Sequence, residues 1–170
     1  NTDDFAQWLL ESFDDNGANT DWLDVITRTA VSQNHNVGVS GGSENLSYRA
    51  SVGYLDQTGT LIGSGKDRLT GRLNLDAKAM NGKLNMKFNM SASQTNGQFA
   101  DNRAVGFAMN MRPTDPVYAA NGNYFQLPGT FANFNPLAAL EKKSNTQRLQ
   151  DFLFNASAGY TILDGLVFNV

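Results

Sequence analysis

Aromatic and amide side chains are concentrated in one long stretch of the sequence, between Phe99 and Leu140. Aromatic rings stack on sugar rings or hold the side chains of peptides, while amide and guanidinium groups supply directional hydrogen bonds. The stretch therefore predicts a contact site for a substrate or a partner protein, and packing of the same rings within the protein is the alternative. The candidate contact residues are Asn102, Arg103, Tyr118, Tyr124, Phe125, Phe131 and Phe134.

Residues for covalent or metal chemistry are scarce by comparison. His35 is the single histidine and there is no cysteine, so the sequence cannot assemble a catalytic histidine pair, a thiol nucleophile or a histidine-based metal cluster. The segment Gly63-Ser64-Gly65-Lys66 partly matches a phosphate-binding loop. However, Thr60 stands where that motif has its first glycine, and a strand rather than a helix is expected next. We expect no enzymatic activity, no metal and no cofactor.

The elements that position these residues begin with a partly helical segment, residues 1–30. Apolar residues at helical spacing predict a helix from about Thr2 to Phe13. A second short helix is expected over residues 21–26, with Asn19 or Thr20 as its cap. This segment is expected to form an extracellular loop with short helices.

From about residue 31 onward the hydrophobic pattern changes to a period of two. Apolar residues alternate with polar ones, which is typical of antiparallel strands that have one apolar and one polar face. The polar face carries Arg49, Arg72 and Lys87 in the middle of strands, where a small soluble barrel would place apolar side chains. The expected strands cover residues 31–41, 45–56, 67–79, 82–95 and 148–162, with another beginning at Leu166.

Short and long connections alternate between these strands. Turn-forming residues make the short connections near 41–45, 80–82 and 163–165, whereas the long ones run from about 56 to 67 and from about 96 to 146. Outer-membrane barrels have this arrangement, with tight periplasmic turns and long extracellular loops. A soluble β-sandwich or lipocalin-like barrel is the alternative, but the longest connection is unusually long for a compact small domain.

Composition limits the possible partners. Only 17% of the 170 residues are charged and the net charge is -3, so the sequence lacks the concentrated basic surface that nucleic acids require. It has no run of about 18 apolar residues that would form a membrane-spanning helix. Because both ends interrupt a pattern, we expect the sequence to be a piece of a longer polypeptide.

A series of short motifs runs from residue 20 to residue 75. The motifs are Thr20-Asp21-Trp22-Leu23-Asp24-Val25-Ile26, Arg28-Thr29-Ala30, Gln33-Asn34-His35-Asn36, Ser40-Gly41-Gly42, and the stretches from Tyr48 to Gly59 and from Arg68 to Leu75. In their order and spacing they resemble the start of the barrel in the SusC/RagA family of TonB-dependent outer-membrane transporters. The remaining sequence, through Val170, fits the next hairpins of that family less strongly.

The resemblance implies a barrel of about twenty-two strands that encloses a plug domain in the outer membrane of Bacteroidetes-type bacteria. Members of the family import glycans or peptides with energy from TonB, which acts through an N-terminal part that lies outside this sequence. They pair with a SusD-like surface lipoprotein that closes the barrel as a lid. Outer-membrane lipid would surround the strands.

Together these observations predict an all-β fold, namely about five to six strands of a larger antiparallel transmembrane β-barrel. Residues 1–30 form a loop with short helices, and residues 31–170 form strands interrupted by a long extracellular loop at about 96–146. The predicted function is part of a TonB-dependent transporter for glycans or peptides. A surface-exposed, adhesin-like binding protein without active transport is the alternative. We expect the long loop to fold over the extracellular mouth of the barrel.

Overall fold

The chain folds into two compact units in a computed structural model that describes residue 6, residues 15–126 and residues 134–170. The sheet unit consists of residues 31–57, 66–97 and 147–170. The loop unit consists of the described residues within 1–30, 58–65 and 98–146. Apart from Ala6, the helix predicted from Thr2 to Phe13 lies outside the described residues.

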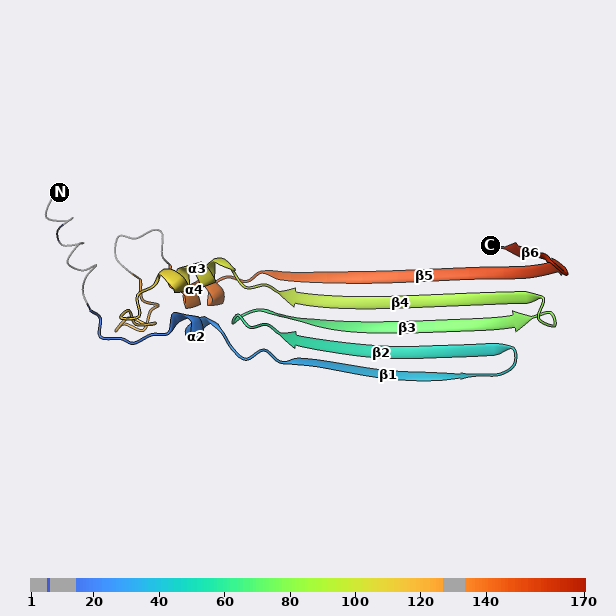
Figure 1. The fold of residues 1–170 in the computed structure, drawn as a ribbon, viewed down its shortest axis with the longest axis horizontal. Helices are drawn as coiled ribbons and strands as arrows, with labels where there is room; N and C mark the ends of the chain where they lie inside the picture. The colour runs from blue at the N-terminus through green and yellow to red at the C-terminus, as the bar shows by residue number, and fades with distance from the viewer. Residues whose placement is uncertain (1–5, 7–14, 127–133) are drawn as a thin grey trace. The chain divides into compact units, whose positions relative to one another are not determined.

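Six strands form a single sheet in which each strand lies beside the next one along the chain (Figure 1). The prediction of an antiparallel sheet with these strands is therefore confirmed. In the first hairpin the antiparallel pairing places Val37 opposite Val52, and in the last hairpin it places Tyr160 opposite Phe168. Apolar residues of neighbouring strands therefore face the same side of the sheet. The strands are β1 (Ser32–Gly42), β2 (Leu46–Thr58), β3 (Gly65–Ala79), β4 (Leu84–Gln98), β5 (Thr146–Leu163) and β6 (Leu166–Asn169).

The connections differ in length, as the sequence predicts, but one of them is shorter than expected. The turn between β3 and β4 contains Met80 and Asn81 at positive φ, followed by Gly82 at φ 84°. The connection between β2 and β3 was expected over residues 56–67, yet it covers only 59–64, because both strands continue further. It is a tight turn in which Gly59 N donates to Ser64 O at 2.9 Å.

Three short helices with described bounds belong to the loop unit: α2 (Trp22–Ile26), α3 (Arg103–Asn110) and α4 (Pro136–Glu141). The helix predicted over residues 21–26 is present, but the prediction that Asn19 or Thr20 caps it is wrong. Asp21 caps α2, because its carboxylate accepts from Leu23 N at 3.0 Å and from Asp24 N at 3.1 Å. The hydroxyl of Thr20 instead donates to the carbonyl of Asp115.

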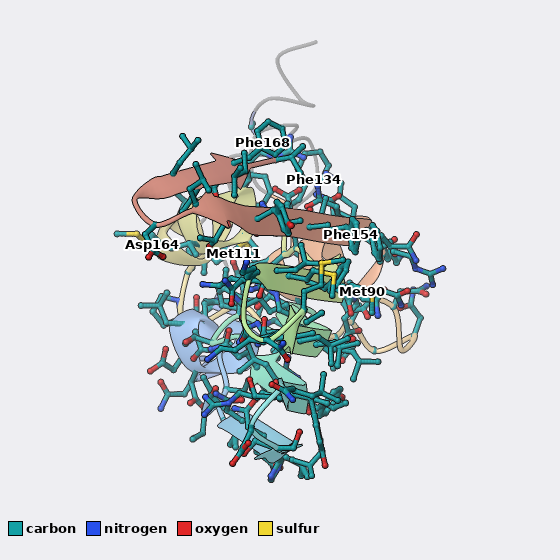
Figure 2. The ribbon with its side chains drawn as sticks, turned by 90° about the vertical axis from the view of Figure 1, so that its right-hand side faces the viewer. Met90, Met111, Phe134, Phe154, Asp164 and Phe168 are labelled. Atoms are coloured by element: carbon teal, nitrogen blue, oxygen red, sulfur yellow. The ribbon has the colours of Figure 1, made fainter. Side chains whose placement is uncertain are left out.

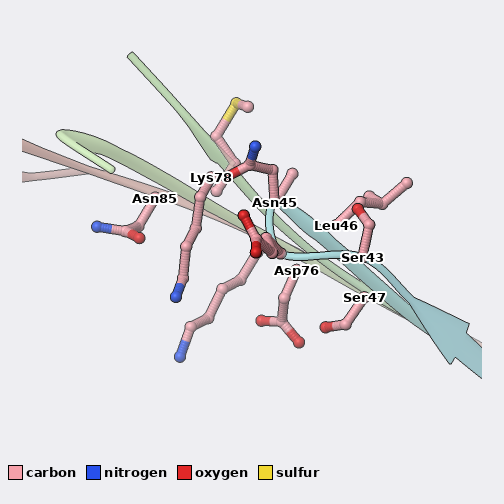
Figure 3. Close-up of a pocket in the computed structure, with 11 residues that line it drawn as sticks. Ser43, Asn45, Leu46, Ser47, Asp76, Lys78 and Asn85 are labelled. Atoms are coloured by element: carbon pink, nitrogen blue, oxygen red, sulfur yellow. The ribbon is translucent and has the colours of Figure 1, made fainter. Parts of the chain in front are cut away.

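The two faces of the sheet differ in chemistry. Figure 3 shows Ser47, Asp76, Lys78 and Asn85 on one side of the sheet near the short turns, and Leu46 on the other. Because side chains alternate along a strand, this assignment extends through the whole sheet. Met90 and Phe154 also share one side of it in Figure 2. We call these the polar face and the apolar face.

None of the described strand residues is buried, and every buried residue of the described chain lies in the loop unit. Large side chains of the apolar face remain open to the surroundings, with Val52 56% exposed and Phe152 69% exposed. A sheet in water would need a second layer to cover such a face. The apolar face therefore requires an apolar surrounding outside the chain. Its members include Leu46, Tyr48, Val52, Leu73, Leu75, Leu84, Met86, Phe88, Phe152 and Phe154.

Replacing Phe88 with arginine tests this assignment, because Phe88 lies midway along the apolar run from Leu84 to Ala92. In the intact barrel, Phe88→Arg should lower the free energy of unfolding by about 2–4 kcal/mol if the side chain faces the bilayer midplane. The neighbouring Asn89→Arg is the matched control, since its side chain lies on the polar face, and it should cost much less. Urea unfolding in lipid vesicles measures both. Equal costs for the two variants would contradict the assignment.

Candidate functional site

The loop unit is held together by a small apolar core built from segments far apart in the sequence. Trp22 and Ile26 of α2 pack with Ala104 and Ala108 of α3 and with Leu140 of α4. Partly buried residues complete the cluster, and they include Leu61 and Ile62 from the 59–64 turn, and Phe125. The core joins the three segments of the loop unit, and Phe125, one of the aromatic residues that the sequence singles out, packs against it.

A buried carboxylate lies in the loop unit. Asp115 is fully buried, and its Oδ1 accepts from Arg112 Nη2 at 2.7 Å and from Asn16 Nδ2 at 3.0 Å. Its second oxygen accepts from Arg112 Nε at 3.1 Å, so the guanidinium forms a bidentate ion pair with the carboxylate. Because Trp22 Nε1 donates to the carbonyl of Arg112, the same network also reaches α2. The network therefore ties residues 16–22 to the turn at 112–115.

A buried amide connects α4 to the aromatic segment. Asn135 is fully buried, and its Oδ1 caps α4 by accepting from Leu137 N and Ala138 N. Its Nδ2 donates to the carbonyls of Val117 at 2.9 Å and Phe125 at 3.1 Å. One side chain thus satisfies the start of the helix and both arms of the 117–125 segment, and all its polar atoms have partners.

The 117–125 segment is a small hairpin that presents two tyrosines side by side. Tyr118 and Tyr124 form a bridge across the hairpin, and their ring centroids are 5.4 Å apart. Tyr118 is 50% exposed, and the ammonium group of Lys142 lies 5.1 Å from the centroid of the Tyr124 ring. The arrangement places two aromatic rings, tilted by 35° to one another, beside a positive charge, and aromatic faces suit sugar rings and peptide side chains.

The hydroxyl of Tyr124 is held in its protonated form. It donates to the carboxylate of Glu141, and this hydrogen bond raises the pKa of Tyr124 to about 12. Burial and the negative charge of Glu141 add to the shift. At neutral pH Tyr124 therefore carries no negative charge.

The remaining candidate aromatic residues divide between surface and core. Phe134 is 46% exposed, and it meets Phe107 edge to face with ring centroids 5.7 Å apart. Phe125 instead packs against the core of the loop unit. Phe131 lies outside the described residues. The structure brings Tyr118 and Tyr124 together, whereas Phe134 pairs with a residue that the sequence analysis did not single out.

The two polar candidates lie at the start of α3. Asn102 precedes the helix and is exposed, although its side chain makes no capping hydrogen bond. Arg103 donates to both carboxylate oxygens of Asp101, at 3.0 and 2.8 Å, and Lys143 approaches the same carboxylate at 2.7 Å. The hydrogen bonds from Arg103 and Lys143 hold the pKa of Asp101 well below its usual range. Substrate or partner contact by Asn102 and Arg103 stays a prediction.

Sequence reasoning missed the residues that hold the site in shape. Arg112, Asp115 and Asn135 were not among the candidates, yet they make the buried polar contacts of the loop unit. The start of α4 at Asn135-Pro136 could have been predicted, because an asparagine cap followed by proline is a common helix start. The ion pair of Arg112 with Asp115 depends on the packing of the loop unit, and no local sequence pattern predicts it.

The described residues contain no group of three or more His, Cys, Asp or Glu side chains that could hold a metal ion. Within the same residues, no helix is both long and apolar enough to cross a membrane. The described part of the loop unit presents exposed rings, hydroxyl and amide groups, and the positive charges of Lys142 and Arg103.

Comparison with known proteins places this architecture. The sequence is 38% identical to the TonB-dependent receptor SusC of Bacteroides thetaiotaomicron, over 84% of this chain. It is 32% identical to the TonB-dependent receptor P26 of Formosa agariphila, over 79% of this chain. The structure matches the RagAB peptide importer in its closed-closed state with a TM-score of 0.70 and 26% identity, covering 89% of this chain. No family model matches the sequence.

The chain belongs to the SusC/RagA family of TonB-dependent transporters. It spans 16% of the length of the SusC receptor and 18% of the matched RagAB chain. As a SusC/RagA-family segment it is an outer-membrane protein, and its sheet is part of a transmembrane β-barrel. The relatives are receptors and transporters rather than enzymes.

Removing the carboxylate of Asp115 tests how the site is held. In the intact protein, Asp115→Ala should destabilise the loop unit by about 1–3 kcal/mol, because it removes the buried carboxylate that accepts hydrogen bonds from Arg112 and Asn16. Hydrogen exchange of the amides in α2 and α3 should rise, while exchange in the strands should not change. Asp24→Ala, an exposed aspartate of the same unit, is the control and should have little effect. Unchanged exchange in Asp115→Ala would contradict a holding role.

Proposed function

We propose that the protein to which this segment belongs imports glycans or peptides across the outer membrane with energy from TonB. A SusD-like surface lipoprotein is its proposed partner. The similarity to the SusC receptor over 84% of this chain carries the proposal. The structural similarity to the RagAB peptide importer, which extends over 89% of the chain, also supports the proposal.

In this proposal the segment performs no covalent chemistry. Its apolar face contacts lipid, its polar face lines the interior of the barrel, and its loop unit contributes contacts with cargo or with the lipoprotein. The exposed rings of Tyr118 and Phe134, and the hydroxyl-bearing ring of Tyr124, are the proposed contact groups. Phe125 is assigned to packing, since it lies against the core of the loop unit.

An uptake experiment with the full-length protein in its own bacterium tests the import function. Deleting the gene should abolish growth on one class of polymer, glycan or peptide, and removing TonB should have the same effect. Affinity purification of the intact protein should recover a surface lipoprotein in stoichiometric amount. Growth on every glycan and peptide source after deletion, with no lipoprotein recovered, would refute the proposal.

The tyrosine pair gives a sharper test of the loop unit. In the full-length protein, Tyr118→Ala combined with Tyr124→Ala should lower cargo uptake or lipoprotein recovery by about tenfold. Each stacked ring contributes about 0.5–1.5 kcal/mol beyond its buried area, and the loss of area adds to this. Leu23→Ala is the matched control, because Leu23 is an exposed apolar residue of the same unit without an aromatic ring.

Surface abundance of each variant, measured by labelling intact cells, separates lost contact from lost assembly. Normal abundance with normal uptake and normal lipoprotein recovery in the double variant would show that the tyrosine pair makes no functional contact.

A further inference from the structure

Charged side chains are divided unequally between the two faces of the sheet. The apolar face has Asp56 and Asp67, which lie close to the strand ends on either side of the 59–64 turn, and Arg148, which lies near the start of β5 after the long connection. The polar face has six basic residues and two acidic ones, although the whole chain has a net charge of -3. The basic residues are Arg49, Lys66, Arg68, Arg72, Lys78 and Lys87, and the acidic ones are Asp76 and Asp151.

Two of the arginines share one hollow on the polar face. Arg68 and Arg72 of β3 line it together with Asn34 and Asn36 of β1 and Ser51 of β2. Gly53, Leu55 and Thr70 complete the lining, so the hollow contains no acidic side chain. Both arginines are exposed, and neither forms an ion pair within the part of the chain that the structure describes.

The guanidinium of Arg68 is oriented by a neighbouring strand. Its Nε donates to Thr95 Oγ1 of β4 at 2.9 Å, which leaves the terminal nitrogens of the same group for a ligand. Arginine presents five N–H donors in a planar fork that matches the two oxygens of a carboxylate. The hydroxyl and amide groups around it, from Ser51, Thr70 and Asn36, add neutral hydrogen-bonding capacity.

The hollow also lies in a distinctive part of the sheet. Arg68 follows the start of β3 at Gly65 by three positions, so it is near the end of the strand that adjoins the 59–64 turn. Near the short turns, by contrast, the hollow shown in Figure 3 contains Asp76 together with Lys78 and Lys87. Charges of both signs compensate one another there. The hollow around Arg68 and Arg72, by contrast, has positive side chains and no negative one in its lining, and such a site concentrates anions.

We propose that this hollow binds a carboxylate of the transported cargo through Arg68 and Arg72. The cargo is then an anionic oligomer, either a glycan that contains uronic acids or a peptide that contains Asp or Glu. Both supply the same carboxylate, and both enter from the side of the long extracellular connections. The inference rests on the proposed import function and narrows its substrate class.

Binding measurements on the full-length transporter, purified with its lipoprotein, test this assignment. The glycan probes are a tetragalacturonate and the neutral tetrasaccharide obtained by reducing its carboxyl groups. The peptide probes are a glutamate-containing peptide and the same peptide with glutamine. We expect at least one acidic probe to bind better than its neutral counterpart, and we expect added salt to weaken that preference. The pair that shows the preference identifies the source of the carboxylate.

The double variant R68Q/R72Q should weaken binding of the preferred acidic probe by about tenfold or more, because charge-assisted hydrogen bonds are lost. Binding of its neutral counterpart should not change. K78Q/K87Q, which removes two positive charges from the same face near the short turns, is the matched control and should change acidic binding by less than about twofold.

Two results would overturn the proposal. In the first, the unaltered transporter binds acidic and neutral probes equally well. In the second, R68Q/R72Q lowers the melting temperature while the preference for the acidic probe is unchanged, so that the hollow holds an acidic segment of the same polypeptide. Uptake assays distinguish these results from failure of the import function itself. A protein that imports only neutral cargo refutes the carboxylate site, whereas one that imports nothing refutes transport.

Discussion

The alternation of side chains across an antiparallel sheet is the constraint on which the rest of the structure depends. Strand pairing satisfies the backbone groups that neighbouring strands turn toward one another, which is what a sheet in lipid requires. Neither face is covered by another layer of the described chain, and no described strand residue is buried. The two faces therefore need two different surroundings. A shift of one residue in the pairing of Val37 with Val52 would exchange those surroundings for an entire strand.

The loop unit differs from the sheet, because it has a buried core of its own. Its apolar cluster is small, and two buried polar side chains accompany it. Asp115 and Asn135 are tolerated inside because hydrogen bonds satisfy their polar atoms. Asn135 also sets the geometry of the tyrosine hairpin, since it bonds to the carbonyls of both arms. The presentation of Tyr118 and Tyr124 therefore depends on a side chain that touches no ligand.

The sequence allowed the strands to be predicted because a period of two is a local property of the chain. Prediction from sequence failed where two local signals compete, or where contacts between residues far apart in the chain determine the local structure. Asp21 outcompeted Thr20 as the cap of α2, since Thr20 bonds to Asp115, which lies 95 positions away. The turn at 59–64 is shorter than predicted, because polar residues at its ends continue the strands. Among the aromatic candidates, the sequence could not separate Phe125, which is partly buried against the core of the loop unit, from Tyr118, which is half exposed.

The composition of the loop-unit core has a consequence for the order of folding. Asn16 and Asp115, which bond directly, are separated by 99 positions, and the core also draws on the 59–64 turn. Closing such long loops costs conformational entropy before any contact forms, whereas each hairpin of the sheet closes locally. We therefore expect the strands to pair first and to bring the segments 15–30, 58–65 and 98–146 within reach of one another. The loop unit would then become ordered last during assembly and would stay open to proteases for the longest time.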